Sequence, residues 1–313
     1  MARWKKFAAP VLSAAIFAIA CWLIYREVRD FGSHDIVAAF TRISWPQRAA
    51  ALALTAAAYG MFVGYDLLAT RLVGRRLPLW QIALAAFLGY AAGNNFGLVL
   101  GGSTVRYRLY TSWGLSATDV VNVMAVLCLT FWLGLFALAG MVFVAEPIPI
   151  PPVLHVPLAT VRPVGYTLLA AVAIWVAIIL TRKQPLTIRN WVLPLPDVRF
   201  TLMQMALACS DFATAAAVAY VLMPKSVALS YPMFLSCYLL AVLAGVVLHV
   251  PGGLGVVELV LLKILPEVPK DELLGALIVF RLFYYFVPLC IAGVIFALHE
   301  LRQGARKLLG RGA

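Results

Sequence analysis

Charged residues are scarce in this sequence. Asp, Glu, Lys and Arg make up 12% of its 313 residues, whereas a soluble domain carries roughly 25%. Hydrophobic residues account for 64% of the chain. This composition excludes an ordinary soluble protein. It predicts an integral membrane protein in which little of the chain is left for a soluble domain.

The chain also lacks the sequence motifs of common catalytic and metal sites. It contains no Walker A loop for ATP and no HExxH zinc motif. None of its cysteines forms a CxxC pair, and all lie inside apolar runs, where a cysteine behaves as a small buried apolar residue. These cysteines are Cys21, Cys128, Cys209, Cys237 and Cys290. We therefore expect no metal, no cofactor and no disulfide.

Acidic residues are fewer than basic ones, and the net charge is +12. Such an excess could indicate a nucleic-acid partner. The basic residues, however, cluster at the ends of apolar runs, which is typical of the loops that stay on the cytoplasmic side of a membrane. We therefore expect no nucleic-acid partner.

Long apolar runs dominate the rest of the chain. They cover residues 7–25, 49–70, 79–100, 118–145, 163–181, 200–223, 231–250, 256–265 and 273–298. The first run follows Arg3, Lys5 and Lys6, and it is longer than the apolar region of a signal peptide. Because about 20 residues cross a bilayer, we interpret it as a retained transmembrane helix.

Two of these runs are interrupted by glycines. Asn94, Asn95 and Gly97 precede Gly101-Gly102, and Pro251-Gly252-Gly253 precedes an apolar run of residues 256–265 that is too short to span. We interpret both regions as re-entrant hairpins. The alternative, in which residues 79–100 cross completely, stays open on length alone.

The distribution of basic residues favours the hairpins. If residues 79–117 and 231–266 each return to their own side, 16 of the 25 basic residues face the cytoplasm, together with both termini. A full crossing by residues 79–100 alone would place the basic loop 182–199 outside. The predicted location is the bacterial inner membrane.

The predicted fold is an all-α polytopic membrane protein with about six full spans plus two re-entrant helical hairpins. The order of helix, helix, hairpin and helix occurs twice with opposite orientation, in residues 1–145 and 163–313, around a proline-rich connector of residues 146–162. Corresponding landmarks lie about 151–153 positions apart. Such inverted repeats place a substrate near the membrane midplane, although two apolar halves could also resemble each other by chance.

Ionisable residues inside spans are costly and suggest function. The sequence places Asp66, Asp211, Glu258 and Arg281 in or near such positions. Each has a structural alternative: Asp66 could pair with Arg71 or Arg75, Asp211 could join two helices by a hydrogen bond, and Glu258 could pair with Arg281.

The glycine breaks could also bind an anion. If the segments after these glycines, Ser103 to Tyr110 and Val256 to Leu265, are half-helices, their N-terminal backbone amides are free. Arg106 and Arg108 could then bind a phosphate. Close helix packing is the alternative role for these glycines. The predicted substrate site comprises Asp66, Gly101, Gly102, Arg106, Arg108, Asp211, Gly252, Gly253, Glu258 and Arg281. Phosphate ligands beside carboxylates suit a lipid headgroup with a phosphate and an amine.

Several segments of the chain resemble one known family. They are residues 64–66, 89–95, 101–110, 113–116 and 129–134, followed by residues 251–258 and 281–288 in the second half. These segments are similar to the N-terminal membrane domain of bacterial lysylphosphatidylglycerol synthetase/flippase proteins, the multiple peptide resistance factor family. The resemblance extends over nearly the whole chain.

The resemblance implies a lipid-translocating domain, often a homodimer, with a role in resistance to cationic peptides. Full-length relatives add a cytosolic domain that transfers lysine or alanine to phosphatidylglycerol. This chain ends at Ala313, about fifteen residues after its last apolar run, so we expect no such domain and no enzyme activity. The leading hypothesis is a flippase for aminoacylated phosphatidylglycerol or a related anionic phospholipid. The alternatives are a non-transporting partner of a separately encoded lipid synthase and an enzyme that acts on a lipid-linked substrate.

Overall fold

The structure is a computed structural model that describes residues 40–97, 101–150, 157–181, 186–188, 191–193, 196–225 and 227–309. Its α-helices are α3 (Trp45–Leu72), α4 (Leu79–Phe96), α5 (Ser103–Ser112), α6 (Ala117–Ala145), α7 (Arg162–Thr181), α8 (Val198–Val221), α9 (Tyr231–Val247), α10 (Val256–Ile264), α11 (Lys270–Arg281) and α12 (Val287–Leu309). A 3₁₀ turn, η3 (Pro251–Gly253), precedes α10, and a π-helical turn, η4 (Leu282–Phe286), joins α11 to α12. Strands β1 (Leu186–Ile188) and β2 (Trp191–Leu193) form a small antiparallel hairpin. The predicted all-α fold is confirmed.

Five of the described helices are long and apolar enough to cross a membrane. They are α3, α6, α7, α8 and the continuous stretch Lys270–His299. Each coincides with a predicted full span, so the chain is a multi-pass membrane protein. The predicted span of residues 7–25 lies outside the described residues.

Local sequence signals define where these helices begin. The hydroxyl of Ser116 accepts a hydrogen bond from the backbone amide of Asp119, and the Asp119 carboxylate accepts from the backbone amide of Ser116, at 3.1 and 3.0 Å. This reciprocal cap satisfies amides that have no partner in the first turn of α6. Ser230 caps α9 in a similar way, followed by Pro232 in the first turn.

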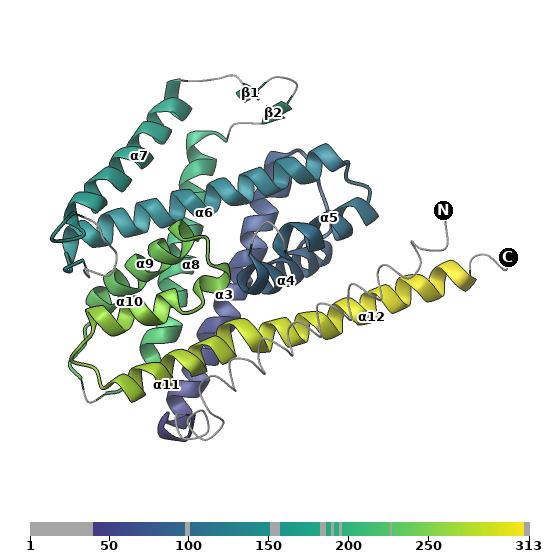
Figure 1. The fold of residues 1–313 in the computed structure, drawn as a ribbon. Helices are drawn as coiled ribbons and strands as arrows, with labels where there is room; N and C mark the ends of the chain where they lie inside the picture. Colours follow the sequence, from purple (N-terminus) through teal and green to yellow (C-terminus); the bar gives the residue numbers. More distant parts are fainter. Residues whose placement is uncertain are drawn as a thin grey trace.

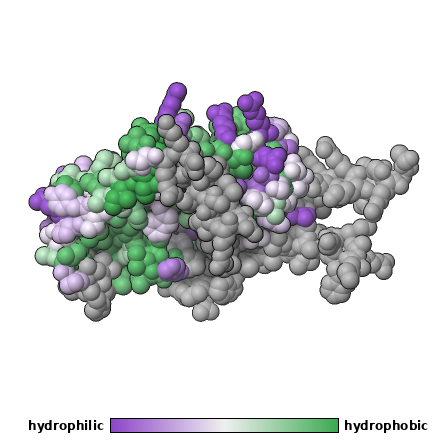
Figure 2. Space-filling model, turned by 90° about the horizontal axis from the view of Figure 1, so that it is seen from above, coloured by the Kyte–Doolittle hydropathy of each residue, from purple (hydrophilic) through white to green (hydrophobic). Residues whose placement is uncertain are grey.

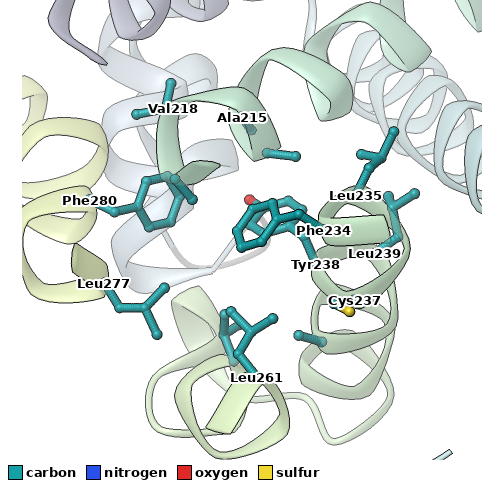
Figure 3. Packing of buried hydrophobic residues seen from close by; sticks show 14 of the residues in the cluster. Ala215, Val218, Phe234, Leu235, Cys237, Tyr238, Leu239, Leu261, Leu277 and Phe280 are labelled. Atoms are coloured by element: carbon teal, nitrogen blue, oxygen red, sulfur yellow. The ribbon is translucent and has the colours of Figure 1, made fainter. Parts of the chain in front are cut away.

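The long helices cross one another around a common interior (Figure 1). Helix α3 packs along α8, and α6 packs against both α7 and α8. Helices α11 and α12 form one extended rod through η4. Between these layers, α9 and α10 contribute Phe234, Tyr238 and Leu261 to a core that includes Leu277 and Phe280 of α11 (Figure 3).

Small residues let α6 approach its neighbours closely. A Cβ atom added to Gly134 of α6 would lie 2.1 Å from the Cβ atom of Ala208 in α8. Between α6 and α7, a Cβ atom at Gly165 would lie 3.0 Å from the carbonyl oxygen of Gly140. Close backbone contact of this kind is a common way to associate helices in membranes.

Two helix pairs each join a helix of 17 or 18 residues to a helix that is too short to span. Helix α4 ends at Phe96, the backbone turns at Gly97 with a φ of 86°, and α5 follows. In the second half, α9 is followed by η3 and by the nine residues of α10, which reach only about 14 Å. A bilayer core is about 30 Å thick. The two predicted hairpins are therefore present as helix pairs, and their re-entrant course in the membrane stays a prediction.

On the face shown in Figure 2, apolar side chains cover much of the described surface, and the most hydrophilic side chains gather in limited areas. Helix α7 illustrates this, because Tyr166, Ile174 and Leu180 are exposed along it. Only Gly165, Val172 and Ile179 of this helix are buried. An apolar helix with so little buried surface is suited to contact lipid.

The hairpin arrangement makes a topological prediction. Because residues 79–100 return, the exposed Ser112 should face the cytoplasm together with Arg76. In a variant without the five native cysteines, Ser112→Cys and Arg76→Cys should resist a membrane-impermeant thiol reagent in intact cells, whereas Glu146→Cys on the opposite side should react. Labelling of Ser112→Cys as strong as that of Glu146→Cys would contradict the hairpin course.

Candidate functional site

The glycine breaks of the two halves meet inside the molecule. The end of α4 contacts η3, and a Cβ atom at Gly252 would lie 2.9 Å from the backbone oxygen of Asn94. The φ of Gly252 is 62°, a conformation that side chains disfavour. Both the close approach and the backbone conformation therefore require glycine at this position.

A small pocket lies at this meeting point. It is lined by Asn94, Asn95, Gly252, Leu254, Arg281, Tyr285 and Phe286. It has room for about one water molecule. The pocket therefore joins α4 of the first half to η3 and η4 of the second half, and a charged side chain reaches it.

The π-helical turn η4 forms one wall of this meeting point. The carbonyl oxygens of Tyr284 and Tyr285 accept hydrogen bonds from Tyr59 of α3 and Asn95 of α4, both at 3.2 Å. Single π-helical turns are frequent at functional sites because they redirect side chains and carbonyl groups. Here the turn connects the last long helix to α3 and α4 of the first half.

The second hairpin carries a buried ion pair between α10 and α11. Arg281 donates through Nε and Nη2 to the two carboxylate oxygens of Glu258, and the Nη2–Oε2 distance is 2.9 Å. Longer contacts join Nη1 to the Gly252 carbonyl at 3.4 Å and Nη2 to the Gly253 carbonyl at 3.3 Å. One arginine thus holds the carboxylate of α10 and the carbonyls of the break.

The first hairpin carries a second buried ion pair, between Arg106 of α5 and Asp66 of α3. Nε and Nη2 of Arg106 lie 2.9 and 2.8 Å from Oδ1 and Oδ2 of Asp66, which is a bidentate arrangement. The hydroxyl of Tyr110 donates to Oδ1 of Asp66 at 2.6 Å. Both side chains of the pair have an exposed fraction of 0%. The pair therefore ties α5 to α3 and neutralises both charges in the interior.

Helix α4 supplies the space for this guanidinium. A Cβ atom at Gly89 would lie 2.7 Å from Cζ of Arg106, so no larger residue fits there without displacing the arginine. The ring of Tyr90 lies beside the guanidinium, with its centroid 4.3 Å from Cζ. Cation–π contacts of this kind are strongest where water is excluded.

A third buried carboxylate, Asp211 of α8, has a different environment. Its Oδ2 accepts a hydrogen bond from Tyr65 of α3 at 3.1 Å. Its Oδ1 is buried and has no hydrogen-bond partner in the part of the chain that the structure describes. Asp66 and Glu258 are each paired with an arginine, whereas Asp211 has no ion pair among the described residues.

Several sequence-based alternatives can now be decided. Glu258 pairs with Arg281 as the structural alternative predicted. Asp66 pairs with Arg106 rather than with Arg71 or Arg75, and that alternative was wrong because Arg75 lies 2.8 Å from Asp119 and Arg71 is exposed. Asp211 does join α8 to α3 through Tyr65.

The glycines of the breaks have their own amides bonded inside tight turns, and the free amides predicted at the starts of the half-helices that follow stay a prediction. The amides of Gly101 and Gly102 donate to the carbonyl of Gly97, at 2.9 and 3.3 Å, and the amide of Gly253 donates to Val250 at 3.0 Å. These turns close on themselves because the chain reverses through tight backbone hydrogen bonds. The second break instead presents carbonyl oxygens to Arg281.

The two arginines of the first hairpin do not converge. Arg106 is buried against α3 and α4, whereas Arg108 is exposed. Residues two positions apart on a helix point in different directions, which explains the separation. A joint grip of both side chains on one phosphate does not fit this arrangement.

The pocket also contains residues that the sequence-based site omitted. Asn94, Asn95 and Tyr285 line it, and Nδ2 of Asn94 is buried without a hydrogen-bond partner among the described residues. The signal that could have identified the first two was present, because two adjacent amides interrupt an apolar run. On the sequence alone, Asn94 and Asn95 indicate only where the break lies.

Relatives of this chain are known from bacteria. An uncharacterized Synechocystis protein, slr0712, is 37% identical over 98% of this chain and 97% of the relative. The Escherichia coli inner membrane protein YbhN is 29% identical over 97% of this chain and 92% of its own length. Both matches therefore span essentially the whole described membrane domain.

A third relative is much longer. Phosphatidylglycerol lysyltransferase of Staphylococcus aureus is 25% identical over 95% of this chain, which corresponds to 34% of the lysyltransferase. The family described as the lysylphosphatidylglycerol synthase transmembrane region matches residues 11–292. The resemblance found in the sequence is thereby confirmed, and the chain belongs to the family of lysylphosphatidylglycerol synthase transmembrane regions.

Proposed function

We propose that the protein is a flippase that moves aminoacylated phosphatidylglycerol, or a related anionic phospholipid, across the bacterial inner membrane. The observation that carries this proposal is the meeting of the two glycine breaks at one internal pocket. Transporters built from inverted repeats bind their substrates where interrupted helices of the two halves meet. Buried charges at that point are the further sign of a polar pathway through a membrane.

The charged groups suit the headgroup chemistry. Arg281 lines the pocket and can bind a lipid phosphate through the planar fork of its guanidinium. Glu258, its present partner, can accept the amine of a lysyl or alanyl headgroup. In the resting protein the two side chains neutralise each other. On lipid binding, the phosphate would pair with Arg281 and the amine with Glu258, in place of the ion pair between them.

The small volume of the pocket means that the described conformation is closed. A pocket of about one water cannot hold a headgroup. Lipid entry therefore requires α3 and α4 to separate from η4, which means breaking the contacts from Tyr59 and Asn95 to η4. These are two single hydrogen bonds, each worth roughly 1 kcal/mol. Breaking them should therefore cost less free energy than breaking either buried ion pair.

The direct test is a leaflet-resolved lipid assay in vesicles. Purified protein should increase the transfer of lysyl-phosphatidylglycerol between leaflets over protein-free vesicles, and phosphatidylcholine should move less because its amine is methylated. Asn94→Leu should lower the rate about tenfold without loss of folding, because it replaces an unpaired amide donor at the pocket with an apolar group. Transfer at the protein-free rate for lysyl-phosphatidylglycerol and for every anionic phospholipid tested would overturn the proposal and leave the role of a non-transporting partner.

A further inference from the structure

Asp211 is the one buried carboxylate of the site, among the described residues, that lacks a cation. Its residue exposure is 7%, and the described ion pairs that involve intramembrane carboxylates are those of Asp66 and Glu258. An ionised carboxylate without a partner is strongly disfavoured in an apolar interior. A carboxyl group in this position avoids that cost by holding a proton.

We propose that Asp211 is a proton-binding site and that lipid movement is coupled to the loading and release of this proton. The coupling rests on the proposed flippase function, whereas the proton site does not. In the step itself Oδ1 of Asp211 forms an O–H bond with a proton from one side of the membrane. That bond later breaks and the proton leaves to the other side, so no other reactant is needed.

The geometry of the carboxyl group fits this role. Oδ2 already accepts a hydrogen bond from the hydroxyl of Tyr65 at 3.1 Å. Oδ1, the oxygen without a partner, is the one left to carry the proton. The hydroxyl of Tyr65 can serve the neutral and the ionised carboxyl group alike, because Oδ2 is an acceptor in both forms.

The groups around Asp211 do not supply a compensating positive charge. The titratable side chains that interact electrostatically with Asp211 are Tyr59 and Tyr65 of α3, Tyr90 of α4, Tyr238 of α9, and Tyr284 and Tyr285 of η4, and Cys209 lies two positions before it on its own helix. Tyrosines and cysteines are ordinarily neutral at physiological pH. Helix α6 contributes Gly134 and Phe131 to this region, and Arg281 of α11 is bound to Glu258.

The same surroundings favour a proton over a metal cation. Hard cations require a shell of several oxygen ligands. Among the described residues, the oxygen atoms shown at this site are those of the Asp211 carboxylate and the Tyr65 hydroxyl, and Oδ1 has no hydrogen-bond partner. A proton needs only one oxygen atom.

A path for coupling leads from Asp211 to the first hairpin. Tyr65 binds Asp211, and its ring lies edge-on to that of Tyr90 at 5.7 Å. Tyr90 in turn lies 4.3 Å from the guanidinium of Arg106. Tyr65 and Asp66 are adjacent in α3, so a shift of Tyr65 on loss of the proton can reach the residue that holds Arg106. The buried Nη1 of Arg106 has no acceptor among the described residues.

The proton site can be tested without a transport assay. Infrared spectra of the protein in nanodiscs at neutral pH should contain the C=O stretch of a protonated carboxylic acid, shifted in D₂O. Asp211→Asn should remove this band and leave the protein folded, because the amide is close in shape to the neutral acid. The matched control is Asp197→Asn at the exposed start of the same helix, where Asn also caps the amide of Phe200. It should leave the band unchanged.

The coupling is tested by steady-state lipid distribution in vesicles. If one proton moves with each lipid, a gradient of one pH unit should shift the leaflet ratio of the lipid about tenfold. Asp211→Asn should abolish this shift, and Asp197→Asn should keep it. A tenfold sodium gradient should produce no shift in any of the three proteins.

The outcomes separate the two proposals. A wild-type spectrum without the band, or a band that persists in Asp211→Asn, shows that Asp211 holds no proton and overturns the inference even when lipid is moved. A shift driven by sodium, or a pH-driven shift that survives Asp211→Asn, overturns the coupling. If the wild-type protein moves no lipid while the band depends on Asp211, the flippase function and the coupling both fail, and the proton site alone is supported.

Discussion

Replacing Arg106 with alanine is expected to leave little folded protein. The change would remove both hydrogen bonds to Asp66 and leave a fully buried carboxylate with only the hydroxyl of Tyr110. Breaking a buried pair from one side costs about 3–5 kcal/mol, which is a large fraction of the stability of most proteins. Thermal unfolding in detergent measures the loss. Arg106→Lys should recover only part of it, since an ammonium group cannot reproduce the fork.

A surface pair of the same chemistry provides the control. Arg75 lies 2.8 Å from Asp119, but half of its side chain is exposed. Such a pair contributes about 0–1 kcal/mol because water and salt screen it. Arg75→Ala should therefore leave the unfolding temperature nearly unchanged.

The neutral double variant distinguishes lost charge compensation from lost contact. Asp66→Asn combined with Arg106→Gln removes both charges and keeps side chains that can bond to each other. It should be more stable than Arg106→Ala by a few kcal/mol, because no uncompensated charge remains buried. If Arg106→Ala unfolds at the same temperature as the wild type, the pair does not hold α5 to α3.

The long helices were predictable from the sequence because hydrophobicity and length specify them. The five described spans coincide with predicted apolar runs to within a few residues. A buried helix in a membrane protein needs an apolar segment of sufficient length, and this requirement is visible in any window of the chain. The glycine breaks were visible for the same reason, because they interrupt the apolar pattern.

The pairing of side chains was less predictable. Asp66 lies five positions from Arg71, yet its partner is Arg106, forty positions away. The partner follows from how α5 folds back past Gly89, which leaves just enough space for a guanidinium. That space depends on the packing of three helices, and local sequence spacing does not encode it.

The π-helical turn η4 was also not predictable. Its sequence, Leu282–Phe286, is apolar and compatible with an ordinary helix. The turn is supported by Tyr59 and Asn95, which lie in the other half of the chain. The sequence of one segment does not indicate which distant residues will contact it in the folded protein.

The two halves differ in charge at nearly corresponding positions. Arg106 and Glu258 lie 152 positions apart, one more than the 151 positions that separate Gly101 from Gly252. Both follow a glycine break, in α5 and α10, and both are buried. If the halves are related as inverted repeats, α5 and α10 carry opposite charges after their breaks. Each charged side chain forms an ion pair with a residue of a neighbouring helix.

Variants of Glu258 and Arg281 should show the second large effect. Arg281→Gln leaves the Glu258 carboxylate without its partner and should cost about 3–5 kcal/mol. Glu258→Gln should cost less, because Arg281 keeps its longer contacts to the carbonyls of Gly252 and Gly253. The double variant removes both charges and should recover most of the stability. Thermal unfolding of the three proteins beside the wild type measures this order.

Transport distinguishes a structural pair from a substrate site. Under the proposed function Arg281 binds the lipid phosphate and Glu258 binds its amine. Each single variant should therefore lose leaflet transfer by roughly tenfold to a hundredfold and the double variant by at least as much, since each lost charged contact is worth roughly 1.5–3 kcal/mol. Lipids without an amine should be affected less by Glu258→Gln than by Arg281→Gln. A double variant that regains both stability and wild-type transfer would show that the pair only holds the hairpin closed. A double variant that is stable and inactive, with single variants that differ between headgroups, assigns the phosphate and the amine to the two side chains.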